Sequence, residues 1–150
     1  DFCLSRGLGD VYKRQNVNMA GFYHITQLAI QEMEKHSSGH VVSITASIDQ
    51  VAISGVYSAL AALSKGGINA ATKSLAIEYA KKGIRVNAVA PGNIKTPMHP
   101  TEIHEALGTY NPIGRLGETN DITDAILFLD SAPFITGEIL HVDGGQSAGH

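Results

Sequence analysis

The 150-residue sequence has no tryptophan and a single cysteine, Cys3. One cysteine cannot form a framework of intrachain disulfides, so we predict a protein of the reducing cytoplasm. Acidic residues outnumber basic ones, with a net charge of -3, and a chain without a basic excess is not predicted to bind nucleic acid. No apolar run approaches the roughly 20 residues of a membrane span, so no membrane contact is predicted.

Clusters of metal-ligating residues are also missing. His99 and His104 lie five residues apart with Glu102 between them, but no further group of ligands accompanies the pair. A zinc site uses three or four cysteine, histidine or carboxylate ligands at characteristic spacing. We therefore predict no metal site, and we interpret the two histidines as part of a polar loop near the substrate.

The first fifteen residues do not fit the pattern of the rest of the chain. Residues 5–15 read SRGLGDVYKRQ, and this segment resembles, codon by codon, the translation of an adapter used in transposase-based DNA sequencing. We therefore interpret residues 1–15 as a non-native scar and exclude them from fold reasoning. Gly7 and Gly9 would otherwise imitate a dinucleotide-binding turn, although Cys3 stands where that turn needs its first glycine.

From Asn16 onward, helical and extended patterns alternate. Apolar residues at helical spacing predict amphipathic helices over residues 18–34, 57–82 and 119–132. Short runs of β-branched residues predict buried strands over 41–44, 84–90 and 139–142. The alternating order favours an α/β fold class with three parallel strands, three helices and helices on both faces of a doubly wound sheet.

The first predicted strand, residues 41–44, has no partner within this sequence on one of its sides. A doubly wound domain places the other half of its sheet along such an edge. We therefore expect residues 16–150 to be the C-terminal half of a larger domain. An incomplete sheet of this size is expected to be only marginally stable alone.

Six short motifs occur in the order typical of one family. They are NVNMAG (16–21), GHVVSI (39–44), SKGG (64–67) with TKSLAIE (72–78), RVNAVAPGNIKT (85–96), GRLGE (114–118) and ITGEILHVDGG (135–145). Together they resemble the short-chain dehydrogenase/reductase family. The resemblance implies a partial Rossmann domain of an oxidoreductase that uses NAD or NADP to transfer a hydride to or from a small alcohol or ketone. It also implies a homodimer or homotetramer.

The resemblance further implies a set of catalytic residues. Lys65 falls at the family's lysine, which lowers the pKa of a catalytic tyrosine and binds the cofactor ribose. Asn18 falls at the asparagine that supports a proton-relay water. The family's serine, which polarises the substrate oxygen, aligns with Ala46. Ser47 is the candidate for that role, because a local bulge can turn its hydroxyl inward.

The position of the proton-donating tyrosine is the main departure from the family pattern. Four residues before Lys65 the chain has Ala61, and the nearest tyrosine is Tyr57. On a continuous helix Tyr57 would lie about 12 Å along the axis from Lys65, instead of about 6 Å. A helix that begins after Tyr57 would let the preceding loop fold the phenol inward. Tyr57 therefore stays open as a displaced proton donor or as a packing residue at the start of the helix.

The segment after the second predicted strand is the expected cofactor edge. Pro91 and Gly92 form a turn at the carboxyl end of a parallel strand, where open α/β sheets bind ligands. The resemblance implies that the Ile94 backbone binds the nicotinamide carboxamide. It also implies that the Thr96 hydroxyl and Lys65 contact the cofactor.

The substituted positions also support a hypothesis from another class. With Ala46 and Ala61 in place of the family's serine and tyrosine, the parent protein can be a non-catalytic relative that binds nucleotide or serves as an interaction subunit. Under either hypothesis this 150-residue chain is expected to be inactive on its own.

Overall fold

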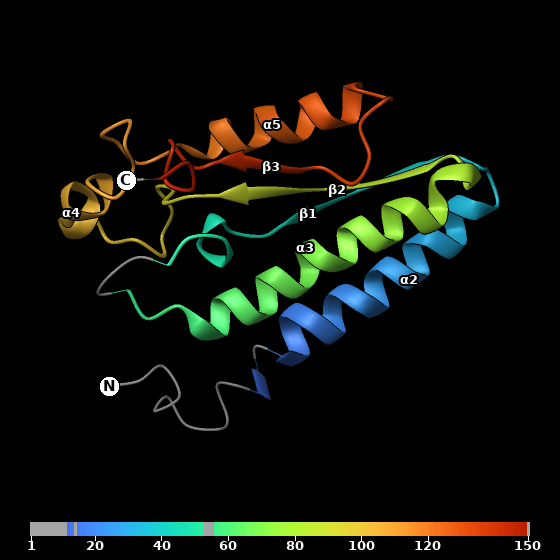
Figure 1. The fold of residues 1–150 in the computed structure, drawn as a ribbon, viewed down its shortest axis with the longest axis horizontal. Helices are drawn as coiled ribbons and strands as arrows, with labels where there is room; N and C mark the ends of the chain where they lie inside the picture. The colour runs from blue at the N-terminus through green and yellow to red at the C-terminus, as the bar shows by residue number, and fades with distance from the viewer. Residues whose placement is uncertain (1–11, 14, 53–55, 150) are drawn as a thin grey trace.

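The computed structural model describes residues 12–13, 15–52 and 56–149. Three parallel strands form one open sheet in the order β1-β2-β3, with bounds β1 Gly39–Ile44, β2 Ile84–Pro91 and β3 Ile139–Val142. Helices α2 (Gly21–Glu34) and α3 (Ala59–Tyr79) cover one face of the sheet, and α5 (Thr119–Ser131) covers the other (Figure 1). The predicted α/β fold class is confirmed.

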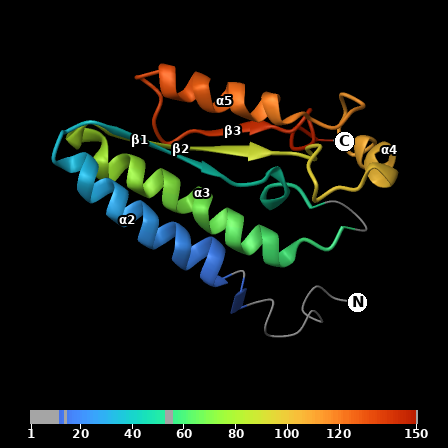
Figure 2. The ribbon, with the colours of Figure 1, turned by 180° about the vertical axis from the view of Figure 1, so that it is seen from behind.

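Strand register brings the carboxyl ends of all three strands to one edge. β1 and β2 pair from Gly39↔Ile84 to Ile44↔Val89. β2 and β3 pair from Ala88↔Ile139 to Pro91↔Val142. The short helix α4 (His104–Gly108) lies at this same end of the molecule, as the view from behind also shows (Figure 2).

β2 is the central strand and is buried on both faces. One apolar cluster, on the side of α2 and α3, consists of Ile30, Ala76, Ile84 and Val86. A second, on the side of α5, consists of Val89, Ala125 and Leu129. A strand that packs against helices on both faces needs apolar residues at successive positions, which explains the nearly continuous apolar run in β2. Within the described part of the chain, β1 pairs only with β2.

The ends of the helices follow local capping signals. α5 begins with a capping box, in which the Glu118 and Asp121 side chains bond each other's backbone N–H groups. The turn after α3 ends at Gly83, which has a φ of 73°. A Cβ at Gly83 would overlap the Ser37 carbonyl oxygen, so the turn before β2 and the turn before β1 can touch only because residue 83 is glycine.

Two predicted boundaries differ from the structure. The helix predicted from residue 57 begins at Ala59, because Ser58 adopts φ -122° and ψ 4°, outside the helical region. The segment between β2 and α5 contains a 3-10 turn at Thr101–Ile103 as well as α4, although no element was predicted there. Among the described residues, no helix combines the length and the apolar character that crossing a membrane requires.

Of the proposed non-native segment, only Tyr12, Lys13 and Gln15 lie among the described residues. Gly7 and Gly9 lie outside them.

Candidate active site

Lys65 is the cation that α3 brings to the carboxyl edge of the sheet. Its Nζ donates a hydrogen bond to the Ile44 carbonyl at the end of β1, at 2.9 Å. Burial removes water from the ammonium and lowers the pKa of Lys65 below its ordinary value. The Lys65 ammonium is therefore a partly desolvated hydrogen-bond donor in a fixed position. A site that binds a polar ligand needs such a donor.

Asn18 is joined to the same helix one residue earlier. It lies in a π-helical turn, η2 (Gln15–Ala20), that leads into α2. Its Nδ2 donates to Ser64 Oγ at 3.3 Å, and the buried Ser64 hydroxyl in turn donates to the Leu60 carbonyl at 3.1 Å. The structure thus brings the predicted asparagine next to the residue that precedes the predicted lysine. Ser64, the link between them, had no role in the sequence prediction.

The hydroxyls on either side of Ala46 are both engaged within the protein. Thr45 Oγ1 donates to the Val89 carbonyl at 3.3 Å. Ser47, only 2% exposed, donates to Gln146 Oε1 at 3.1 Å. The Ser47 hydroxyl therefore ties the end of β1 to the turn after β3. Gln146 carries no motif, and only the folded chain reveals it as the partner of Ser47.

Tyr57 lies two residues before the first residue of α3, and 69% of its surface is exposed. It lines an open hollow of about 420 Å³ together with Asp49, Gln50 and Ala62. Among the described residues, neither Lys65 nor Ser47 lines this hollow. The displaced helix start that would free Tyr57 from α3 is present, but the phenol lies mostly in solvent.

Pro91 and Gly92 end β2 against the turn that follows β3. The Gly92 N–H donates to the Val142 carbonyl at 3.1 Å, and a Cβ on Gly92 would lie 2.8 Å from Asp143 Cα. Burial raises the pKa of Asp143, but hydrogen bonds from Ser147 and Gly145 outweigh it and hold the pKa below its ordinary value. An ionised Asp143 therefore holds this turn in place.

Ile94 and Thr96 lie in the segment that leaves the carboxyl edge. Ile94 is buried, and its backbone runs beside Gly117, with the Lys95 N–H donating to the Gly117 carbonyl at 2.9 Å. The Ile94 carbonyl lies 2.8 Å from His99 Nδ1 and so accepts from that nitrogen. Thr96 is half-buried, and its carbonyl accepts from the His99 N–H at 2.9 Å.

The two histidines of this segment bond to backbone carbonyls. His104 Nε2 lies 2.8 Å from the His99 carbonyl, as His99 Nδ1 does from that of Ile94. A ring nitrogen that faces a carbonyl must carry the hydrogen, so it cannot at the same time ligate a metal. Within the part of the chain that the structure describes, no three His, Cys, Asp or Glu side chains are placed to hold a metal ion.

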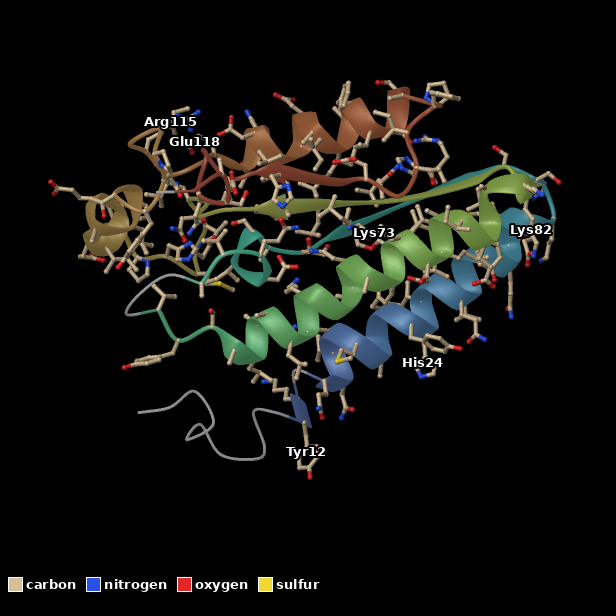
Figure 3. All side chains as sticks on the ribbon, in the orientation of Figure 1. Tyr12, His24, Lys73, Lys82, Arg115 and Glu118 are labelled. Atoms are coloured by element: carbon tan, nitrogen blue, oxygen red, sulfur yellow. The ribbon has the colours of Figure 1, made fainter. Side chains whose placement is uncertain are left out.

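A polar hollow of about 360 Å³ lies beside this segment at the start of α5. Its lining includes Asn93, Asn111, Arg115, Asp121 and His141. Arg115 Nη1 donates to Asp121 Oδ2 at 3.1 Å, and Figure 3 shows Arg115 close to Glu118 at this end of the molecule. Arg115 and Asp121 bind each other, and Asp143 in the same lining binds backbone N–H groups, so we treat this hollow as part of the scaffold of the carboxyl edge.

Residues 7–147 match the family model described as enoyl-(acyl carrier protein) reductase. The chain is similar to the 3-oxoacyl-(acyl carrier protein) reductase of Thermotoga maritima, with 36% identity over 139 residues, 87% of this chain and 54% of that protein. It is 38% identical to the 3-oxoacyl-(acyl carrier protein) reductase of Bos taurus over 138 residues, 91% of this chain and 56% of that protein. The chain thus spans about half the length of the curated relatives it matches.

Solved structures agree with the sequence comparison. The structure of ElxO with NADP bound matches with a TM-score of 0.91 and 34% identity, and the match covers 99% of this chain and 63% of that one. A gluconate 5-dehydrogenase from Burkholderia cenocepacia, in complex with NADP and tartrate, shares the fold with a TM-score of 0.89. The parallel sheet, the motif order and these relatives together place the chain in the short-chain dehydrogenase/reductase family.

Proposed function

We propose that the full-length protein containing this chain is an oxidoreductase that uses NAD or NADP to interconvert a small alcohol and the corresponding ketone or aldehyde. The observation that carries the proposal is the position of Lys65, which Ile44 holds at the carboxyl edge of the sheet. The relative ElxO, solved with NADP bound, supports the same cofactor class. We propose the cytoplasm as the setting, since the chain has one cysteine.

The residues at this edge fit such a cofactor. A lysine ammonium has three donor hydrogens, and one of them is used by the Ile44 carbonyl. The turn at Pro91 and Gly92 ends the neighbouring parallel strand, so its backbone reaches the same edge. We assign Lys65 to the ribose, and Pro91, Gly92, Ile94 and Thr96 to the nicotinamide side. The nicotinamide, when bound, supplies or accepts the hydride.

Asn18 and Ser47 complete the proposed site. Asn18 would orient a water near Lys65, since its amide is anchored to Ser64. Ser47 would polarise the substrate oxygen only if its hydroxyl turns away from Gln146.

Replacing Lys65 tests the proposal. In the full-length protein, Lys65→Met should weaken binding of NADH or NADPH by at least about tenfold. It should also lower turnover on a panel of small ketones and aldehydes, followed by the absorbance of the reduced cofactor. Lys73→Met is the matched control, because Lys73 is an exposed lysine on the same helix (Figure 3). Equal effects of the two substitutions would contradict the assignment of Lys65.

The exposure of Tyr57 favours a second candidate, a relative that binds nucleotide without catalysis. The Tyr57 phenol is 69% exposed in this chain, and the Ala61 side chain carries no group that can donate a proton, which supports this candidate. If Tyr57 is the proton donor, Tyr57→Phe should reduce kcat by about 10²–10⁴-fold while the cofactor still binds. If the protein is non-catalytic, the unmodified protein should bind cofactor and turn over no compound of the panel.

We also propose that residues 16–150 form the C-terminal part of a larger Rossmann domain and that residues 1–15 are not native. Two findings support the first statement: the outer edge of β1 has no partner strand in the described part of the chain, and the relatives are longer. Sequencing the source DNA from a library prepared without transposase adapters tests the second. The codons for residues 5–15 should be replaced by others, and their persistence would contradict the proposal.

For the full-length protein we propose a homodimer or homotetramer assembled through α2 and α3. These helices expose the apolar side chains of Tyr23, Ile25, Leu28 and Ile77, and apolar side chains gathered on one face are typical of an interaction surface. Size-exclusion chromatography with light scattering should give a dimer or tetramer mass, and a monomer mass would contradict it.

A further inference from the structure

The amino ends of the strands hold a polar cluster that has no part in the proposed active site. His40 is the second residue of β1, and its side chain is only 8% exposed. Its Nδ1 lies 3.2 Å from Asp130 Oδ1, at the end of α5. Its Nε2 lies 2.9 Å from Asn87 Nδ2, on β2. One imidazole therefore connects two strands and a helix.

The neighbours of His40 determine which ring nitrogen carries the hydrogen. The Asn87 amide is oriented by two backbone bonds, since its Nδ2 donates to the Ile135 carbonyl and its Oδ1 accepts from the Glu138 N–H. Asn87 Nδ2 is thus a donor toward His40. Arg85 Nη1, 3.4 Å from His40 Nε2, is also a donor. Nε2 must therefore be the acceptor, and the hydrogen stands on Nδ1, where the Asp130 carboxylate accepts it.

Arg85 is held in place and cannot easily retreat from His40. Its Nη1 donates to the Leu129 carbonyl at 2.7 Å, and its Nη2 donates to the Asp130 carbonyl at 2.9 Å. These carbonyls belong to the last turn of α5, where a cation is favourable. A second hydrogen on His40 would point at two donors, one of which carries a permanent charge.

We infer that the protonation state of His40 controls how stably the amino ends of β1 and β2 are joined to the end of α5. The neutral imidazole stabilises this junction, and protonation of Nε2 destabilises it. When His40 is neutral, its two nitrogens join the three elements. When Nε2 is protonated, it faces the Arg85 guanidinium and the Asn87 amide, and the contact is repulsive. A groove of about 760 Å³ lined by His40, Arg85 and Asp130 gives water access to the cluster.

The charged groups that face His40 are Arg85 from β2 and Asp130 from α5. Burial lowers the pKa of His40, the Asp130 carboxylate raises it and Arg85 lowers it, with the result below the ordinary value of 6.5. The unfolded chain therefore takes up this proton first as the pH falls. The stability that neutral His40 contributes is fully present above pH 6.5 and is lost as the pH falls through the lower pKa of the folded protein.

The test compares thermal unfolding of the full-length protein at about pH 7.5 and about pH 5.5 by circular dichroism. His40→Gln keeps an acceptor at the place of Nε2 but cannot take up a proton. Acidification should lower the Tm of the unmodified protein by roughly 2 °C or more beyond its effect on His40→Gln. His36→Gln, at an exposed histidine, should behave like the unmodified protein. An equal loss of Tm in the protein and in His40→Gln would overturn the inference.

A second measurement applies even where His40→Gln does not fold. Nuclear magnetic resonance of the protein labelled at histidine follows the His40 ring through a pH titration. Its midpoint should lie below 6.5, the ordinary value, and Asp130→Asn should lower it further because the carboxylate that favours the cation is gone. A midpoint at or above 6.5, or one that Asp130→Asn raises, would overturn the inference.

Discussion

At the scale of single residues, the bond between Ser47 and Gln146 joins two turns at the carboxyl edge. Both side chains are buried, so each depends on the other for its hydrogen bond. Ser47→Ala leaves Gln146 Oε1 without a donor and should cost about 1–3 kcal/mol of the free energy of unfolding. Urea unfolding of the full-length protein measures this cost.

Thr45→Val is the matched control for Ser47→Ala. It removes the neighbouring hydroxyl, but the Val89 carbonyl keeps the Thr45 N–H as a donor at 2.8 Å. Its cost should stay below about 1 kcal/mol. The double variant Ser47→Ala, Gln146→Leu should recover part of the lost stability, because it also removes the Gln146 oxygen that Ser47→Ala leaves without a donor. If Ser47→Ala and Thr45→Val lower the free energy of unfolding equally, the Ser47–Gln146 hydrogen bond contributes no more to stability than the Thr45 hydroxyl does.

The residue scale also shows where prediction from sequence stops. Lys65 and Asn18 could be assigned because each stands in a recognisable motif, and their sites remain predictions. The partner of Ser47 could not be foreseen, since Gln146 is 99 residues away and nothing local marks the pair. Tyr57 was ambiguous for a different reason. Ser58 is a residue type favoured directly before a helix, but its side chain makes no capping hydrogen bond, and the Ala- and Leu-rich residues that follow would also continue a helix begun earlier.

At the scale of elements, the turns before β1 and β2 touch at Gly83. Gly83 combines a φ of 73° with a position where a Cβ would overlap the Ser37 carbonyl. Gly114 has a similar φ of 80° but open space around it. Gly114→Ala should cost only the left-handed penalty of about 1–2 kcal/mol, and Gly83→Ala should cost at least about 1 kcal/mol more.

Urea midpoints of the two alanine variants separate these effects. If Gly83→Ala and Gly114→Ala lose the same stability, the backbone at Ser37 moves to make room for the new Cβ. The close approach of Gly83 to Ser37 then adds nothing to the cost of the substitution.

Hydrophobic periodicity predicted the three long helices and the three strands correctly, because each of them packs in a layered arrangement of helices on a sheet. Helices α2, α3 and α5 each pack one face on the sheet, and β2 is covered on both sides, so burial imposes a readable pattern. The segment between β2 and α5 lacks such a pattern. Pro97, Pro100 and Pro112 interrupt it, and α4 has only five residues, too few to repeat a period. Its short helix was therefore missed.

At the scale of the whole molecule, the outer edge of β1 determines how residues 16–150 should behave without the proposed other half of the domain. Ile44 at the end of β1 is 43% exposed, and no strand among the described residues pairs with the backbone groups along that side. We expect the isolated segment to unfold over a broad temperature range and to self-associate. Circular dichroism and light scattering measure these two properties. A sharp, concentration-independent transition of a monomer would contradict the expectation.

The length of β1 separates the two polar ends of the sheet. On β1, His40 and Ile44, whose carbonyl binds Lys65, are four residues apart, roughly 13 Å along the strand. Effects of substitutions that far apart are expected to be additive. Substitutions in the loops that follow the carboxyl ends of the strands can therefore alter the choice of substrate during evolution. The dependence of stability on pH that His40 sets at the amino ends should be inherited unchanged.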